Sequence, residues 1–227
     1  MLVLFTDFGL QGPYIGQVEA VLQRHAPGVP VIKLFSDLPP FDIQAATYLL
    51  PACTQGFTPG TVFVCVVDPG VGGKRPGVVV RADGRWYIGP NEGLFVLLAR
   101  RAKHIQCWLL PDPAPTASPS FHGRDVFAPV AGRLARDGRY CGAELATTEL
   151  DKPGWPDDLW RVVYIDGFGN AITGLRSSAV EPDAVFNVNG QSLHHARTFS
   201  DVDEGEAFWY GNSSGLVEFA VNRGRAD

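Results

Sequence analysis

The stretch TVFVCVVDPGVGGKR, residues 61–75, decides the fold of this chain. Its first seven residues are apolar and mostly β-branched without a break, which is typical of a strand covered on both faces. This strand ends in Asp68 and a glycine-rich loop that runs to Arg75. Such a strand indicates an open α/β layer, in which ligands bind beyond the carboxyl ends of the strands.

Short apolar runs alternate with amphipathic segments on both sides of this strand, so residues 1–150 are predicted to form an α/β domain. Its fold class is a mostly parallel sheet flanked by helices. Further strands are predicted at 2–5, 29–34, 77–82 and 85–88, and helices at 11–25, 42–50, 92–101 and 124–137.

The pattern changes after a segment with Pro153, Gly154 and Pro156, which is predicted to be a linker over 149–158. Short strands separated by turn residues follow at 161–165, 171–175, 184–188, 191–193, 207–210 and 216–220. They predict a small C-terminal antiparallel β-barrel or sandwich over residues 157–227. A domain of about 70 residues is marginal alone, so we expect it to pack on the first domain or on another subunit.

Composition excludes several classes of protein. The chain has 227 residues, 45% apolar and 19% charged, with a net charge of −5 and no basic stripe, so it is not expected to bind nucleic acid. The four scattered cysteines lack zinc-site spacing, no histidine has a partner at metal-ligand spacing, and no signal or membrane segment is visible. We therefore expect a cytoplasmic protein without a metal or a membrane anchor.

The glycine-rich loop holds the first candidate catalytic pair, Asp68 and Arg75. It lacks the Gly-Lys-Ser/Thr ending of a phosphate loop and the Gly-x-Gly-x-x-Gly pattern of a dinucleotide site. The two residues can form a mere surface ion pair, but their place at the end of a core strand favours a functional site.

Two further segments hold candidate functional residues, one before a predicted helix and one after a predicted strand. His122 lies just before a helix, whose positive end favours a neutral imidazole; its alternative role is a helix cap. Asp7 lies just after the first strand and serves either a turn or the hydroxyls of a diol such as ribose.

The second half contains two candidate binding turns. A tight turn explains the glycines of residues 166–170 but does not require Phe168, which is suited to stack on a ring. The hydroxyls of Ser213 and Ser214 lie in a segment that is either a plain turn or a site for a carboxylate.

These segments, in this order, resemble the S-adenosylmethionine hydroxide adenosyltransferase family, relatives of the fluorinase and chlorinase enzymes. The resemblance covers the whole chain. It implies that water attacks the ribose 5′ carbon of S-adenosylmethionine and that adenosine and L-methionine form without a cofactor. It also implies that Asp68, Arg75 and His122 surround the water. Arg75 stays protonated and can stabilise developing hydroxide, whereas the sequence does not choose between Asp68 and His122 as the proton acceptor.

The resemblance further implies the substrate contacts. Asp7 would hold the ribose hydroxyls, Asp166 the methionine ammonium group and Ser213 the carboxylate. The residues implied in substrate binding are Asp7, Phe41, Phe121, Gly123, Asp166, Phe168, Asn170, Ser213, Ser214, Asn222 and Arg223. The resemblance also implies a homotrimer, with each site between the first domain of one subunit and the second domain of its neighbour.

Some positions depart from the family pattern. Asn91 and Glu92 stand in a segment that many members write Pro-Asp-Asn-Gly, Gly174 replaces a common asparagine, and Ser214 stands where the halide enzymes have arginine. These departures leave Asp68, Arg75 and His122 intact and bear on recognition of the methionine end. A halide-dependent adenosyltransferase, against which Asp68 and His122 argue, and a non-catalytic S-adenosylmethionine or adenosine sensor are the alternatives. A methyltransferase is disfavoured because no Gly-x-Gly loop follows the first strand.

Overall fold

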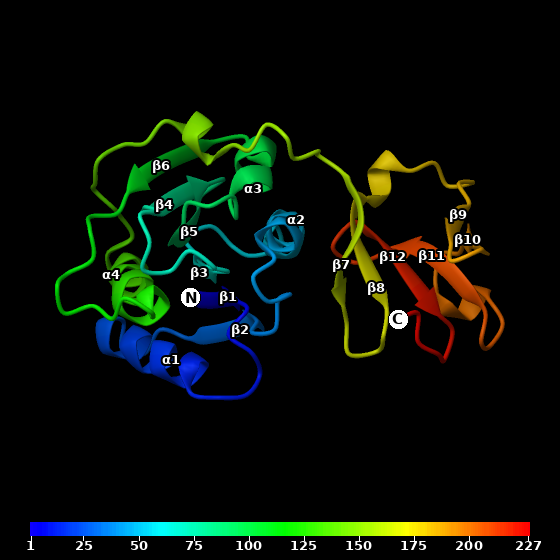
Figure 1. Cartoon of the computed structure of the whole chain (residues 1–227), viewed down its shortest axis with the longest axis horizontal. Coiled ribbons are helices and arrows are strands. Elements are labelled where there is room, and N and C mark those ends of the chain that lie inside the picture. Colours follow the sequence, from blue (N-terminus) through cyan, green and yellow to red (C-terminus); the bar gives the residue numbers. More distant parts are fainter. The chain divides into compact units, whose positions relative to one another are not determined.

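The computed structural model describes residues 1–227. The chain divides into two compact units, Met1–Pro153 and Gly154–Asp227, which run from blue to yellow-green and from yellow to red in Figure 1. The division falls within the segment that the sequence predicts to be a linker. Each unit has its own sheet.

A six-stranded sheet forms the centre of the first unit, with the order β2-β1-β3-β5-β4-β6. Its strands are β1 (Leu2–Thr6), β2 (Val31–Phe35), β3 (Val62–Val66), β4 (Gly77–Ala82), β5 (Arg85–Pro90) and β6 (Ile105–Leu109). The pairs β1–β2, β1–β3 and β3–β5 are parallel, and β4 runs antiparallel to both of its neighbours. The prediction of a mostly parallel sheet is confirmed. β3 lies inside the sheet with all five residues buried.

Helices cover both faces of this sheet. They are α1 (Tyr14–His25), α2 (Ile43–Thr54), α3 (Val96–Arg101) and α4 (Ala128–Asp137), the last preceded by a π-helical turn over Gly123–Phe127. α1 begins later than predicted because Gly12 has a φ of 98° and Pro13 follows it. α3 is also shorter than predicted, since Gly93 before it has a φ of 119°. α2 is longer and continues through Pro51, and its last residue, Thr54, contacts the buried Tyr87 hydroxyl at 3.2 Å.

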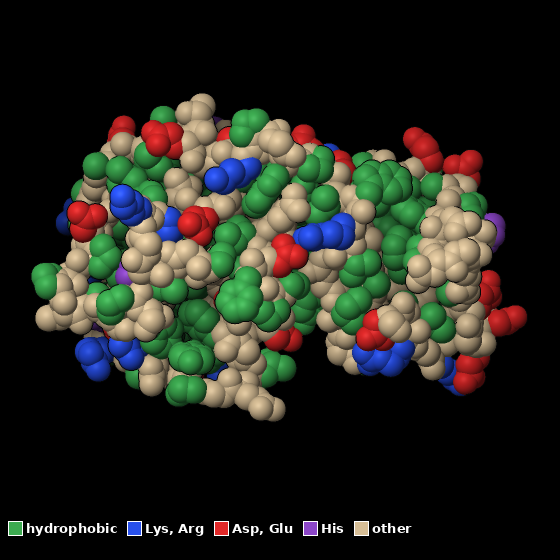
Figure 2. Space-filling model, in the orientation of Figure 1, with side chains coloured by type: hydrophobic (Ala, Val, Ile, Leu, Met, Phe, Trp, Pro, Cys, Tyr) green, Lys and Arg blue, Asp and Glu red, His purple; other side chains and the backbone are tan.

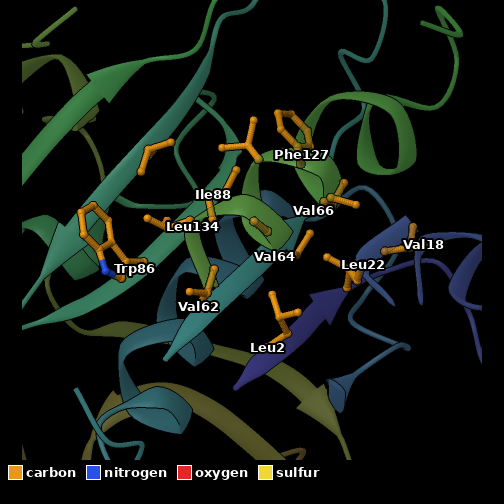
Figure 3. Packing of buried hydrophobic residues seen from close by; sticks show 14 of the residues in the cluster. Leu2, Val18, Leu22, Val62, Val64, Val66, Trp86, Ile88, Phe127 and Leu134 are labelled. Atoms are coloured by element: carbon orange, nitrogen blue, oxygen red, sulfur yellow. The ribbon is translucent and has the colours of Figure 1, made fainter. Parts of the chain in front are cut away.

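The main core lies between one face of the sheet and the helices α1 and α4. Alternate residues of β1 and β3, such as Leu2 and Val64, point into it, together with Val18 and Leu22 of α1 and Leu134 of α4 (Figure 3). The intervening residues of the same strands are buried too, so the strands are covered on both faces as predicted. This packing fixes the strand ends that carry the polar loops.

The second unit is built on another six-stranded sheet, with the order β7-β8-β12-β11-β10-β9. The strands are β7 (Leu159–Ile165), β8 (Ala171–Arg176), β9 (Phe186–Val188), β10 (Gln191–His195), β11 (Ala207–Gly211) and β12 (Leu216–Val221). Neighbours are antiparallel except β10 and β11. The sheet is a curled half-barrel that stays open, because β7 and β9 are edge strands and do not pair with each other.

The surface agrees with the mixed composition. On the face shown in Figure 2, lysine and arginine side chains lie singly or in small groups among acidic ones, without a continuous basic area. None of the helices has the length and hydrophobicity needed to cross a membrane.

Candidate active site

The polar loops of the first unit gather at the carboxyl edge of the parallel strands. Asp7 directly follows β1 and Asp68 follows β3. Arg75 precedes β4, and because β4 is antiparallel to β5 it begins at this same edge. His122 immediately precedes the π-helical turn that leads into α4. The fold therefore brings chemistry-bearing residues from four separate segments to one place, as expected for an open α/β sheet.

Arg75 connects Asp68 and His122. Its Nε donates to Asp68 Oδ1 at 2.8 Å, and its Nη2 donates to Asp68 Oδ2 and lies 2.9 Å from His122 Nδ1. The side chains of Arg75 and Asp68 are only 7% and 5% exposed, so they are not a surface ion pair. The guanidinium also lies 5.4 Å from the centre of the Phe127 ring. The predicted triad is a contiguous, buried, hydrogen-bonded group.

The contact with Arg75 determines the protonation pattern of His122. A guanidinium can only donate, so Nδ1 of His122 must accept, and a neutral ring then carries its proton on Nε2. Burial lowers the pKa of His122, and the Arg75 charge lowers it further, against opposing effects of Asp68 and Asp125. The side chain makes no capping bond, so the capping alternative is not observed. Burial and the Arg75 charge thus favour the neutral ring that the sequence predicts.

A cavity of about 90 Å³ lies beside the triad. It is lined by Asp7, Phe8, Phe41, Val66, Asp68, Val71, Ser120, Phe121, His122 and Gly123. Six of the residues proposed from sequence thus meet here. Arg75 does not line the cavity but contacts Asp68 and His122, which do. Phe8, Val66, Val71 and Ser120 were missed. Phe8 and Ser120 directly adjoin the predicted residues Asp7 and Phe121 in the sequence, and this adjacency is the signal by which they could have been found.

Asp7 joins two loops at the edge of the cavity. Its Oδ2 accepts a hydrogen bond from the backbone N–H of Phe41 at 3.1 Å, so it does more than close its own turn. Phe41 is held with a φ of 63°, an uncommon conformation for a bulky residue, and the residue is 73% exposed. Burial raises the pKa of Asp7, and the bond from Phe41 opposes this effect.

Aromatic rings form one wall of the cavity. Phe8 and Phe121 line it with ring centres 5.6 Å apart. Tyr14, outside the lining, packs on Phe8 at 6.3 Å and on Phe121 at 5.4 Å, and the Arg124 guanidinium covers Phe121 at 5.0 Å. Gly123 is required by this packing, because a Cβ there would lie 2.7 Å from Phe8 Cζ. A wall of rings beside carboxylates attracts cations.

The second unit brings together a different part of the predicted set. The Asp166 carboxylate accepts bonds from the backbone N–H groups of Phe168 and Asn170, both at 2.9 Å, and from the Asn170 side chain at 3.1 Å. Asp166 therefore organises its own loop, as the turn interpretation expects. Phe168 is left 79% exposed at the tip of the loop. The segment that follows Asn222 and Arg223 lies against this loop, since Ala226 N donates to Gly169 O at 2.9 Å.

Ser213 and Ser214 belong to a different turn from that loop. They lie in the turn before β12, whereas Asn222 and Arg223 follow its other end. The six residues of β12 separate the two places by roughly 20 Å at the usual rise per residue. The predicted contacts in this unit thus form two groups at opposite ends of one strand.

A larger hollow of about 610 Å³ lies elsewhere on the first unit, lined by Arg81, Gly84 and residues 103–106. Its charged side chains, Arg81 and Lys103, are exposed cations. It contains no carboxylate and lies where β6 begins, away from the triad. It is therefore a weaker candidate than the smaller cavity. No group of three or more His, Cys, Asp or Glu side chains is arranged to hold a metal ion.

Comparisons with known proteins agree with this picture. Residues 2–142 match the family model of the SAM hydroxide adenosyltransferase N-terminal domain, and residues 160–227 match that of the C-terminal domain. A Thermus thermophilus protein named (R)-S-adenosyl-L-methionine hydrolase is 41% identical over 97% of this chain and 91% of its own length. A Nocardia brasiliensis fluorinase is 22% identical over 98% and 90%. The crystal structure of an uncharacterized conserved protein from Thermotoga maritima has a TM-score of 0.84 at 29% identity, covering 100% of this chain and 94% of that one.

Proposed function

The chain belongs to the SAM hydroxide adenosyltransferase family, and on that premise we propose that it hydrolyses S-adenosyl-L-methionine to adenosine and L-methionine. The observation that carries the proposal is the buried Asp68–Arg75–His122 group at the wall of an aromatic cavity. It combines a group that can hold water with walls that suit a sulfonium cation. No cofactor is needed for this reaction.

The chemistry follows from the charges. The water oxygen forms a bond to the ribose 5′ carbon while the bond from that carbon to sulfur breaks, and the electron pair stays on sulfur as neutral methionine. The leaving group needs no proton, so the protein has to remove one proton from water and orient the oxygen. Rings and carboxylates around the cavity stabilise the cationic substrate before attack.

We assign the proton of the water to Asp68. Nδ1 of His122 already accepts a hydrogen bond from Arg75. The other ring nitrogen then carries the proton, so the ring offers other groups a donor, Nε2–H. A carboxylate has about four acceptor sites, and Arg75 occupies two of those on Asp68. Arg75 holds Asp68 and His122 in fixed orientations, and His122 Nε2–H is suited to donate to the water oxygen. His122 is thus an orienting group rather than the base.

The cavity also favours water over halide. Asp7 and Asp68 both line it, and two carboxylates repel an anionic nucleophile. The direct test is to incubate the protein with S-adenosylmethionine in oxygen-18 water, with and without chloride. We expect adenosine labelled at its 5′-hydroxyl in both cases. A halogenated nucleoside would support the transferase alternative, and tight binding without methionine release would support the sensor.

The substrate we propose is the epimer with R configuration at sulfur, which the names of the relatives specify. Inverting the sulfonium exchanges the places of the methyl and methionine chains, so a rigid site should distinguish the two. Incubation with a mixture of both epimers is expected to consume the R form and leave the S form. Equal consumption of both would contradict this choice.

We further propose a homotrimer in which a neighbouring copy completes each site. The cavity of about 90 Å³ is well below the ~300 Å³ of a complete small-molecule site. Co-expression of Asp68→Asn and Asn170→Ala chains is expected to restore activity in mixed trimers, because some sites then receive two intact halves. Activity no higher than that of either variant, or a monomer in light scattering, would contradict the proposal.

We also propose a cytoplasmic location, because all four cysteines are free.

The pH dependence should reflect His122. Activity requires the neutral ring. Activity is therefore present above the pKa that His122 has in the folded protein, and it is lost as the pH falls through that pKa. Because burial and Arg75 lower the pKa below its ordinary 6.5, the acid limb of kcat/KM is expected below pH 6.5. His122→Gln keeps an acceptor for Arg75 and should move this limb to lower pH. A midpoint above 6.5 in the wild type would contradict the assignment.

A further inference from the structure

The second unit buries a carboxylate that the proposed reaction does not use. Glu218 lies in β12 and is 4% exposed. Its oxygens meet neutral donors: Tyr210 Oη donates to Oε1 at 2.5 Å and Asn212 Nδ2 donates to Oε2 at 2.8 Å. Burying a carboxylate is costly, and these hydrogen bonds offset part of that cost. Its partners indicate what the carboxylate does.

Tyr210 and Glu218 form a cross-strand pair. They are directly opposite each other in the register of β11 and β12, so their side chains lie on the same face of the sheet. Burial and the Glu218 charge raise the pKa of Tyr210, so its hydroxyl stays protonated and donates. The Tyr210 bond therefore fixes the Glu218 carboxylate in one position.

Asn212 connects Glu218 to the turn that carries Ser213 and Ser214. Its Oδ1 accepts from Ser214 N at 2.9 Å and from Leu216 N at 3.1 Å. An asparagine amide can flip, and the flipped form would turn donors toward these N–H groups. A carboxylate only accepts, so Glu218 keeps Nδ2 on its own side and Oδ1 on the turn.

We propose that Glu218, oriented by Tyr210, is a positioning residue that fixes the Asn212 amide and thereby the 213–215 turn that receives the carboxylate of methionine. The inference rests on the proposed function for the identity of that ligand. According to this proposal, binding of the methionine end of the substrate depends on the buried side chain of Glu218, whereas binding of the adenosine end does not.

The test is product inhibition by L-methionine and by adenosine in the wild type, Glu218→Gln, Asn212→Ala and the double variant. Asn212→Ala is expected to raise the inhibition constant of methionine ~10-fold, as the loss of about one hydrogen bond to a charged group would do. Glu218→Gln should raise it ~3-fold, because its amide no longer enforces one orientation. The double variant should match Asn212→Ala, since Glu218 acts through Asn212. Adenosine inhibition should change less than ~2-fold.

Additive effects, equal weakening of both products, or unchanged methionine inhibition would overturn the proposal. Asn187→Ala is the matched control, because its Oδ1 accepts Gly190 N at 3.2 Å in another hairpin. If Asn212→Ala does not fold, Tyr210→Phe tests the same series of hydrogen bonds, with a smaller effect that is equally selective for methionine. Titration calorimetry with methionine and adenosine needs no turnover, so it decides the role of Glu218 even if the wild type releases no adenosine.

Discussion

Replacing Asp68 by asparagine is expected to lower kcat by ~100- to 10,000-fold, the usual contribution of a positioned acid or base, and to change KM little. The amide is nearly isosteric but cannot take the proton of the attacking water. Arg75 and the cavity walls remain, so substrate binding should persist. The measurement is release of adenosine and methionine at saturating substrate, together with binding of S-adenosylmethionine to the variant by calorimetry.

Two comparisons make this result specific. Asp158→Asn breaks a similar two-point pair with Arg176 in the second unit and should leave turnover unchanged. His122→Ala should also lose most turnover and retain binding, but less severely than Asp68→Asn, because it removes an orienting donor. Asp68→Asn retaining more activity than His122→Ala would instead make His122 the proton acceptor.

The elements that positioned this site were visible in the sequence because they have strong local signals. The doubly buried strand at 62–66 and the Asp83-Gly84 hairpin needed only periodicity and turn chemistry. Helix starts were less certain. α3 begins at Val96 rather than at 92 because the backbone at Gly93 is in a left-handed conformation, which residue spacing does not reveal.

Within the site, residue types could be predicted but contacts could not. The sequence predicts Asp68, Arg75 and His122 as a set, whereas the hydrogen bonds that Arg75 donates to both others depend on the fold. That single contact favours Asp68 over His122 as the proton acceptor, a choice that the sequence leaves open. The bond from Phe41 to Asp7 spans 34 residues, and the Glu218 network depends on cross-strand register, so neither has a local signature.

Replacing Arg75 by methionine is expected to lower the free energy of unfolding of the first unit by ~3–5 kcal/mol, because it leaves Asp68 charged and buried without its partner. For a protein of this size, each kcal/mol corresponds to a fall in Tm of ~2–4 °C. Arg176→Met in the second unit breaks a more exposed pair, with side chains 41% and 20% exposed, and should cost only ~0–1 kcal/mol. Thermal and urea denaturation of the two variants measure the contrast.

A double variant separates the stability role of Arg75 from its catalytic one. Asp68→Leu combined with Arg75→Met replaces both charges by apolar groups, and such exchanges of buried ion pairs are often neutral or stabilising. We therefore expect the double variant to recover most of the Tm that Arg75→Met loses and to remain inactive. If its Tm stays as low as that of Arg75→Met, the loss comes from the packing of Arg75 on Phe127. Recovery of stability without activity would mean that the buried pair is kept for the chemistry of water, since the fold does not require it.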